Sequence, residues 1–146
     1  MTNPDPGSAR KLIGQCLCGN LRYSVADEFV YAAICHCSDC RRATGSAFKP
    51  FAGIEGEKLR IASGHDDIMK FGGERAHDVH CKHCGSLLYS VLGAFVHVTM
   101  GTLVDAPSIR PGAHIFVGSK APWYTIHDDL PQYQEHVVEA GSDNQA

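Results

Sequence analysis

The chain has 146 residues, a net charge of −3, and 44% apolar and 20% charged residues. This length fits one domain with its own core, and the acidic balance offers no basic face for nucleic acid, which we do not expect as a partner. No segment approaches the ~20 apolar residues of a membrane span, and the polar N-terminus lacks the apolar core of a signal peptide. We therefore expect a cytoplasmic globular protein, without a membrane partner, whose thiols stay reduced.

Short β-strand patterns dominate the chain between two polar ends. We expect a disordered leader at residues 1–11, a single folded domain at residues 12–136 and a flexible tail at residues 137–146. Alternating or apolar runs bounded by glycine and polar residues predict strands at residues 21–25, 29–34, 58–61, 67–71, 87–91, 95–100 and 114–117. Helical signal is limited to residues 38–43 and a turn or two at 130–138. Many short strands separated by turns favour a mainly β fold of stacked antiparallel sheets.

Seven cysteines form three motifs, which are Cys16-x-Cys18, Cys35-x-Cys37-x-x-Cys40 and Cys81-x-x-Cys84. An odd number of thiols cannot pair completely in disulfides, and a single intervening residue is too short for an unstrained bridge. Two thiolates at these spacings can instead reach one metal ion from a single turn, and zinc suits such ligands best. Gly19 and Gly85 permit the left-handed turn that would point backbone amides at the sulfurs.

The seven thiolates divide naturally into four plus three. The local group of Cys35, Cys37 and Cys40 is the predicted open site, where zinc would keep one position for water or a substrate. The pairs Cys16/Cys18 and Cys81/Cys84 would share a second, structural zinc that clamps an early hairpin to a later one. An alternative keeps both zinc ions structural, with His36 or a water as the fourth ligand of the second. A disulfide or an iron–sulfur cluster fits the spacing less well.

These motifs and their flanking residues resemble the glutathione-dependent formaldehyde-activating enzyme family, also called the centromere-protein-V-like family. The resemblance lies in Gly14-Gln15-Cys16-Leu17-Cys18-Gly19, in the segment from Cys35 to Gly45, in Cys81-Lys82-His83-Cys84-Gly85-Ser86 and in the segment from Phe116 to Tyr124 with Leu130-Pro131. It spans roughly residues 12–135.

The resemblance implies a zinc-bound β-tent fold and two zinc ions as cofactors. It also implies a structural zinc on Cys16, Cys18, Cys81 and Cys84 and a catalytic zinc on Cys35, Cys37 and Cys40. The implied reaction condenses formaldehyde with glutathione to S-(hydroxymethyl)glutathione, a carbon–sulfur lyase reaction run in reverse, so a small-molecule thiol such as glutathione is the expected partner.

A mechanism on these residues would use the open zinc to bind a thiol and lower its pKa, so that a thiolate attacks the aldehyde. Direct polarisation of the carbonyl is the other option, which the charge of three thiolates disfavours. The candidate substrate-binding residues are Arg41, Arg42, Lys49 and Lys120, as cations for an anionic thiol, and Trp123, as a pocket wall. Each is also explained by a solvated surface charge or by core packing.

Two further functions remain open from the sequence. One is a non-catalytic zinc-binding module for protein interaction, of the centromere-protein-V-like kind, and the other is a zinc-buffering or chaperone-like protein. Exposed sheet edges would allow a homodimer. His36 and His83, inside the cysteine motifs, are candidates for hydrogen bonding beside a metal. The remaining histidines are interpreted as structural. Asp128 and Asp129 could include an acid or base, but they resemble a turn before Leu130-Pro131 more closely.

Overall fold

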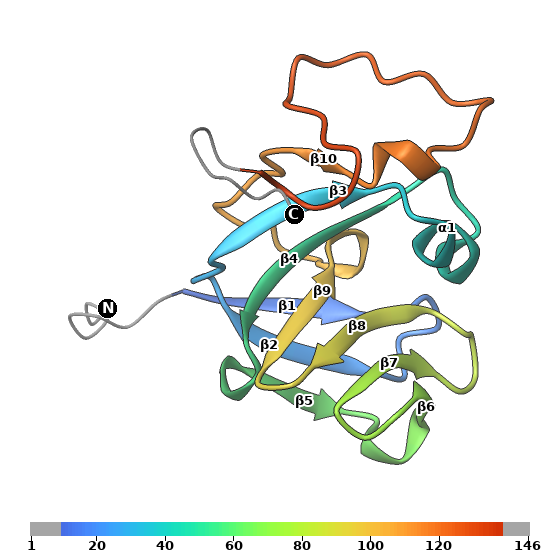
Figure 1. Cartoon of the computed structure of the whole chain (residues 1–146). Helices are drawn as coiled ribbons and strands as arrows, with labels where there is room; N and C mark the ends of the chain where they lie inside the picture. Colours follow the sequence, from blue (N-terminus) through green and yellow to red (C-terminus); the bar gives the residue numbers. More distant parts are fainter. Residues whose placement is uncertain (1–9, 139–146) are drawn as a thin grey trace.

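The computed structural model describes residues 10–138 and contains two β-sheets (Figure 1). The smaller sheet has the order β1–β2–β5, formed by Lys11–Gln15, Arg22–Ala26 and Leu59–Ser63. The larger sheet has the order β10–β3–β4–β9–β8–β7–β6, formed by His114–Ile115, Tyr31–Cys35, Lys49–Glu55, Phe95–Thr99, Leu87–Leu92, Ala76–Cys81 and Ile68–Gly72. All strand pairs are antiparallel except β10 with β3. The predicted mainly β fold of stacked sheets is confirmed.

Helical structure is short throughout the described residues. One α-helix, α1, spans Ser38–Thr44, close to the predicted bounds. Four single 3₁₀ turns connect strands or follow them: η1 at Gly56–Lys58, η2 at His65–Asp67, η3 at Met100–Thr102 and η4 at Val117–Ser119. No helix within residues 10–138 is long and apolar enough to cross a membrane.

The main core lies between the two sheets because alternate residues of their strands face each other. Its buried apolar side chains include Leu12, Tyr23 and Val25 from the smaller sheet and Ile54, Val79, Leu88, Val96 and Val98 from the larger one. The rings of Tyr23 and Tyr89 meet edge to face, with centroids 6.0 Å apart. The smaller sheet thus covers one face of the larger sheet and leaves the opposite face uncovered.

The C-terminal segment differs from its prediction. Residues 130–138 contain no helix, and their backbone instead runs in extended form beside β10. The backbone amide of Tyr133 donates to the carbonyl of His114 at 2.9 Å, and the backbone amide of His114 donates to the carbonyl of Pro131 at 2.8 Å. The predicted strand at residues 114–117 ends after Ile115, because Phe116 adopts a left-handed conformation with a φ of 55°.

The N-terminal boundary also differs slightly from its prediction. Strand β1 begins at Lys11, inside the predicted leader, and the Arg10 guanidinium donates to the Asp27 carboxylate at 3.2 Å. Residues 1–9 and 139–146 lie outside the described residues. Val137, assigned to the tail from the sequence, contacts the folded body at a cavity described below.

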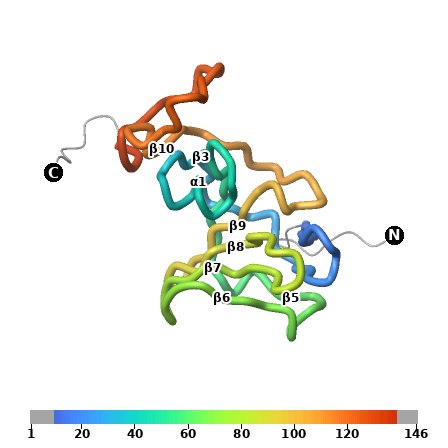
Figure 2. Tube along the Cα trace, turned by 90° about the vertical axis from the view of Figure 1, so that its right-hand side faces the viewer, coloured from blue at the N-terminus to red at the C-terminus, as the bar shows by residue number. Residues whose placement is uncertain are grey.

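Three strands were not predicted, namely β1, β4 and β7. Strand β4 is central to the larger sheet although it contains Pro50 and Gly53. Pro50 is tolerated because it lies next to the first residue of the strand. Figure 2 shows that α1 lies near β3 and β10, at the end of the molecule opposite β5 and β6. This end carries the three-cysteine motif.

Candidate functional site

Two similar turns build the four-cysteine group. In the first, which follows β1, the amide of Gly19 donates to the carbonyl of Cys16 at 3.2 Å; in the second, which follows β7, the amide of Gly85 donates to that of Cys81 at 2.8 Å. Both glycines have positive φ values, of 84° and 80°, which side-chain-bearing residues rarely adopt. The predicted left-handed turns are present, and each brings two thiols to one point.

The four sulfurs of Cys16, Cys18, Cys81 and Cys84 lie within 4.8 Å of one another. The Sγ atom of Cys18 is 3.6 Å from that of Cys16 and 3.7 Å from that of Cys81, far longer than a disulfide bond. All seven cysteines are free thiols. The arrangement is that of a closed four-ligand group able to hold a metal ion.

The four-cysteine group joins the two sheets. Its first pair follows β1 of the smaller sheet and its second pair follows β7 of the larger one, so the predicted link between an early and a later hairpin is present. Ser86 adds a second tie, because its hydroxyl accepts from the amide of Leu17 at 2.9 Å and lies 3.3 Å from the Cys84 sulfur. Although burial raises the pKa of Cys84, hydrogen bonds from Ser86, Cys18 and Cys81 together outweigh it and lower this pKa to about 5.

The three-cysteine group, hereafter the triad, lies where β3 turns into α1. Cys35 is the last residue of β3, and Cys37 caps α1, with its sulfur accepting from the amide of Cys40 at 3.2 Å. The three sulfurs lie within 4.8 Å of one another, as the spacing predicted. Among residues 10–138, no fourth cysteine, histidine or acidic side chain joins the triad. A metal ion here would keep a position free of protein ligands.

The thiols of the triad influence one another strongly. The side-chain hydrogen bond between Cys35 and Cys40 lowers the pKa of Cys35 and raises the pKa of Cys40. Two adjacent thiolates repel each other, so the ionisation of one of these thiols disfavours the ionisation of the other. A cation bound among the three sulfurs would remove this repulsion.

A buried chain of hydrogen bonds lies beside the triad, through the residue between its first two cysteines. The Nε2 atom of His36 is 2.8 Å from Nδ1 of His114, whose Nε2 is 3.0 Å from both carboxylate oxygens of Asp128. The two imidazoles are 0% and 1% exposed. Burial, together with the charges of His114 and Lys120, lowers the pKa of His36 to about 4, so this ring is neutral at pH 7.

The carboxylate of Asp128 assigns the tautomers along this chain. A carboxylate only accepts, so Nε2 of His114 carries a proton. When His114 is neutral, its Nδ1 accepts from Nε2–H of His36. The Nδ1 atom of His36 is then a bare acceptor, and it is buried without a hydrogen-bond partner. From the sequence, His36 was a candidate for hydrogen bonding beside the metal and Asp128 a candidate acid or base, but nothing linked them to His114, because His114 and Asp128 lie about eighty and ninety residues from His36 along the chain.

Lys49 is the predicted substrate-binding residue that lies nearest the triad in the sheet. It pairs directly with Cys35 across β3 and β4, so the two side chains share one face. Its side chain is 7% exposed, and Nζ lies 3.4 Å from the hydroxyl of Ser90, which donates to Asp78 at 2.6 Å. The charge of Lys49 opposes the rise in the Cys40 pKa. A buried cation thus stands beside three potential thiolates.

The other predicted substrate-binding residues have different surroundings. The ammonium of Lys120 donates to the carbonyls of Ala121 and Tyr124, which closes a small loop. Arg41 lies on α1, with a buried Nε that has no hydrogen-bond partner, and Arg42 lies on the exposed side of the same helix. Trp123 is 71% exposed, so its indole faces solvent.

The histidines of the second cysteine turn have hydrogen-bond partners that support the fold. Nδ1 of His80 lies 3.1 Å from the carbonyl of Gly85, and Nε2 of His83 lies 2.8 Å from the carboxylate of Asp67. Both contacts tie the turn to its neighbours. This outcome agrees with the structural interpretation of His80, whereas His83, a candidate for hydrogen bonding beside a metal, bonds to Asp67.

Comparison with known proteins supports the same family as the motifs do. The family model described as glutathione-dependent formaldehyde-activating enzyme matches residues 11–119. A crystal structure of a Rhodobacter sphaeroides protein has the same fold, with a TM-score of 0.54 and 23% identity over 66% of this chain and 91% of that one. A search of curated proteins finds no match. The matched segment contains all seven cysteines, and the chain belongs to the glutathione-dependent formaldehyde-activating enzyme family.

Proposed function

We propose that this protein is a zinc-dependent enzyme of the carbon–sulfur lyase type that acts on thiol adducts of a small aldehyde. The reaction would be the formation of S-(hydroxymethyl)glutathione from glutathione and formaldehyde, or its equivalent with a related thiol. The observation that carries the proposal is the triad, where three cysteines converge without a fourth protein ligand among the described residues. Family membership supports the same chemistry.

The sulfur geometry fits zinc. Four thiolates at about 2.3 Å from a tetrahedral ion lie about 3.8 Å apart, close to the 3.6 and 3.7 Å found between Cys18 and its neighbours. We assign a structural zinc to Cys16, Cys18, Cys81 and Cys84, and a catalytic zinc to Cys35, Cys37 and Cys40. Reduced thiols and the absence of disulfides are in keeping with the expected cytoplasmic location.

The reaction needs a thiolate at neutral pH. When bound, the zinc of the triad would stabilise the thiolate form of a substrate and so lower its pKa. In the overall reaction, the thiol sulfur forms a bond to the aldehyde carbon, the carbonyl π bond opens, and the thiol proton ends on the new hydroxyl oxygen. No external oxidant or reductant is required.

The residues around the triad would orient and balance the reacting groups. Lys49 offsets the negative charge of three cysteine thiolates, and its burial keeps water from screening that charge. A ligand that reached the buried Nδ1 of His36 would find a ring nitrogen without a hydrogen-bond partner among the described residues. Arg41 and Lys120 remain predicted contacts for the carboxylates of an anionic thiol, and Trp123 remains a predicted wall.

The test combines metal analysis with a direct assay. Elemental analysis should give two zinc ions per chain, and NMR exchange spectroscopy with glutathione and ¹³C-formaldehyde should show accelerated formation of S-(hydroxymethyl)glutathione. Cys35→Ser and Cys40→Ser should lower this rate at least about tenfold while the four-cysteine zinc stays bound. Ser46→Ala, at an exposed position just past α1, is the matched control. Full activity in both cysteine variants, or no acceleration by the two-zinc wild type, would overturn the proposal and leave the interaction module as the better function.

A further inference from the structure

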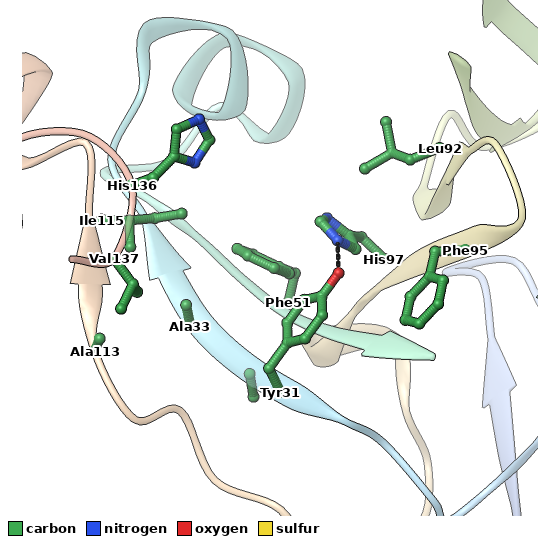
Figure 3. Close-up of a pocket in the computed structure, with 11 residues that line it drawn as sticks. Tyr31, Ala33, Phe51, Leu92, Phe95, His97, Ala113, Ile115, His136 and Val137 are labelled. Carbon is green, nitrogen blue, oxygen red and sulfur yellow. Dashed lines mark hydrogen bonds between the residues drawn. The ribbon is translucent and has the colours of Figure 1, made fainter. Parts of the chain in front are cut away.

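A cavity of about 650 Å³ lies on the same face of the larger sheet as the triad. Figure 3 shows Tyr31, Phe51 and His97 on one wall and Ala113, Ile115 and Val137 on the other. These residues come from β3, β4, β9 and β10 and from the C-terminal segment beside β10. Cavities of 300–1,000 Å³ are the usual size for small ligands.

Among residues 10–138, the lining of this cavity is mainly apolar and contains no lysine, arginine, aspartate or glutamate; its polar side chains are those of Tyr31, His97 and His136. Its central polar contact is internal, because the hydroxyl of Tyr31 lies 2.7 Å from Nε2 of His97 (Figure 3). The rings of Phe51 and His97 stack with centroids 4.4 Å apart. Burial, helped by the charge of Lys49, lowers the pKa of His97 to about 4, so this ring is neutral at pH 7.

The cavity adjoins the triad through shared strands. Ile115, which lines the cavity, is the direct partner of Cys35 across β10 and β3. Ala33 also lines it and precedes Cys35 by two residues, so the two side chains point to one face. Phe51 and Ile115 pack in one apolar cluster with the three cysteines of the triad. The cavity and the triad therefore lie on one face of the sheet and share one apolar cluster.

We propose that this cavity is the subsite for an uncharged apolar substituent, an aryl or branched alkyl group, carried by the thiol that binds at the triad. The inference rests on the proposed function for the identity of the ligand as a thiol. The carboxylates and the ammonium of glutathione would find no charged partners in this cavity, so glutathione would bind at the triad with these groups outside it. An aryl or branched alkyl group would instead gain from leaving water and from stacking on Phe51, His97 and Tyr31.

The test compares probes on the zinc-loaded full chain by isothermal titration calorimetry. Benzyl mercaptan should bind at least about tenfold more tightly than 2-mercaptoethanol, because the phenyl ring adds buried apolar area. Benzyl alcohol has the ring without the thiol and should also bind, with a negative heat-capacity change. Equal affinities for the two thiols would overturn the inference while leaving the proposed thiol chemistry in place.

Two variants locate the binding. Ala33→Phe fills the cavity, and Leu92→Lys adds a charge at its lining, at a side chain that is 45% exposed and so carries little folding risk. Both should lower the affinity for benzyl mercaptan about tenfold or more and leave 2-mercaptoethanol unchanged. Matched controls are Ala62→Phe on β5 and Val104→Lys, both exposed and outside the cavity. Unchanged affinity for benzyl mercaptan in Leu92→Lys would overturn the inference.

Two further outcomes separate the alternatives. If benzyl mercaptan binds no more tightly than benzyl alcohol, Leu92→Lys abolishes the binding of both and 2-mercaptoethanol does not bind, the apolar site stands and the proposed thiol chemistry fails. If sedimentation velocity shows a dimer that benzyl alcohol dissociates, the natural occupant is a second copy of the chain, and the substrate subsite is overturned.

Discussion

Nε2 of His36 lies 2.8 Å from Nδ1 of His114, and this side-chain contact adds to the backbone hydrogen bond from the amide of His36 to the carbonyl of Ile115 in joining the loop of the triad to β10, the edge strand of the larger sheet. Both rings are buried, so neither can exchange its partner for water. Asp128, whose side chain is 47% exposed, anchors the other side of His114. The contact therefore positions the residue between Cys35 and Cys37.

We predict that His114→Phe lowers the free energy of unfolding by about 1–3 kcal/mol, because it leaves the buried Nε2–H of His36 without an acceptor. Urea denaturation of the zinc-loaded protein measures this change. His127→Phe, at an exposed position of the same C-terminal region, is the control and should change stability by less than about 0.5 kcal/mol. Equal stabilities for the two variants would contradict the assigned chain of hydrogen bonds.

Lys49 should matter for metal retention at the triad. Lys49→Met keeps the apolar stem but removes the buried cation next to Cys40, so we expect zinc affinity at the triad to fall about 10- to 100-fold. Competition with a chelator whose absorbance changes when it binds zinc measures this affinity. Lys82→Met, at an exposed lysine within the second cysteine turn, should leave the triad unaffected. A fall of the same size in Lys82→Met would show that the effect is not local to the triad.

The two cysteine groups should differ in their effect on folding. Cys81→Ser removes a ligand from the group that joins the two sheets, and we expect it to lower the free energy of unfolding by more than about 4 kcal/mol. Cys35→Ser should cost less, since the triad lies within one strand-to-helix segment. Thermal unfolding with zinc analysis of each variant provides the comparison. If Cys35→Ser destabilised the fold more than Cys81→Ser, the assignment of the four-cysteine group as structural and of the triad as catalytic would be wrong.

Stability should fall with acidification because of His97. Its pKa is lowered to about 4, so the unfolded chain binds a proton near pH 6.5 while the folded chain does not. The stability present at pH 7 is therefore lost progressively as the pH falls from about 6.5 to about 4. After allowance for partial exposure of the ring, the loss is about 1–2 kcal/mol.

This pH dependence is measured by urea unfolding at pH 7.0 and pH 5.0. His97→Gln removes the titrating ring and should reduce the difference between the two pH values. His65→Gln, at an exposed position on η2, is the control and should preserve the wild-type difference. An identical pH dependence in His97→Gln and wild type would contradict the role given to His97.

Local sequence was sufficient for the cysteine groups. The spacing within Cys16-x-Cys18 and Cys81-x-x-Cys84, and the glycine after each pair, determine a tight turn whose sulfurs converge whatever lies elsewhere in the chain. The division into four and three followed from the number of thiols and the metal's preference for four ligands. Strands with clear alternation, such as β2 and β5, were likewise predictable.

Segments with mixed signals were not predictable. Strand β7 carries His77, Asp78 and His80, and such polar residues mask a strand that alternates between the core and the face of the triad. Residues 130–138 have apolar residues at helical spacing, yet their amides and carbonyls pair with β10 instead. Tertiary hydrogen bonding outweighed local propensity in both segments.

The sequence by itself determined the family, the mainly β fold and the two cysteine groups, because these depend on short-range spacing and side-chain chemistry. Only the tertiary structure decided what surrounds the triad: the pairing of Lys49 with Cys35, the chain from His36 through His114 to Asp128, and the apolar cavity against Ile115. Each of these depends on strand register, which sets which distant residues share one face of a sheet and which side chains are removed from water.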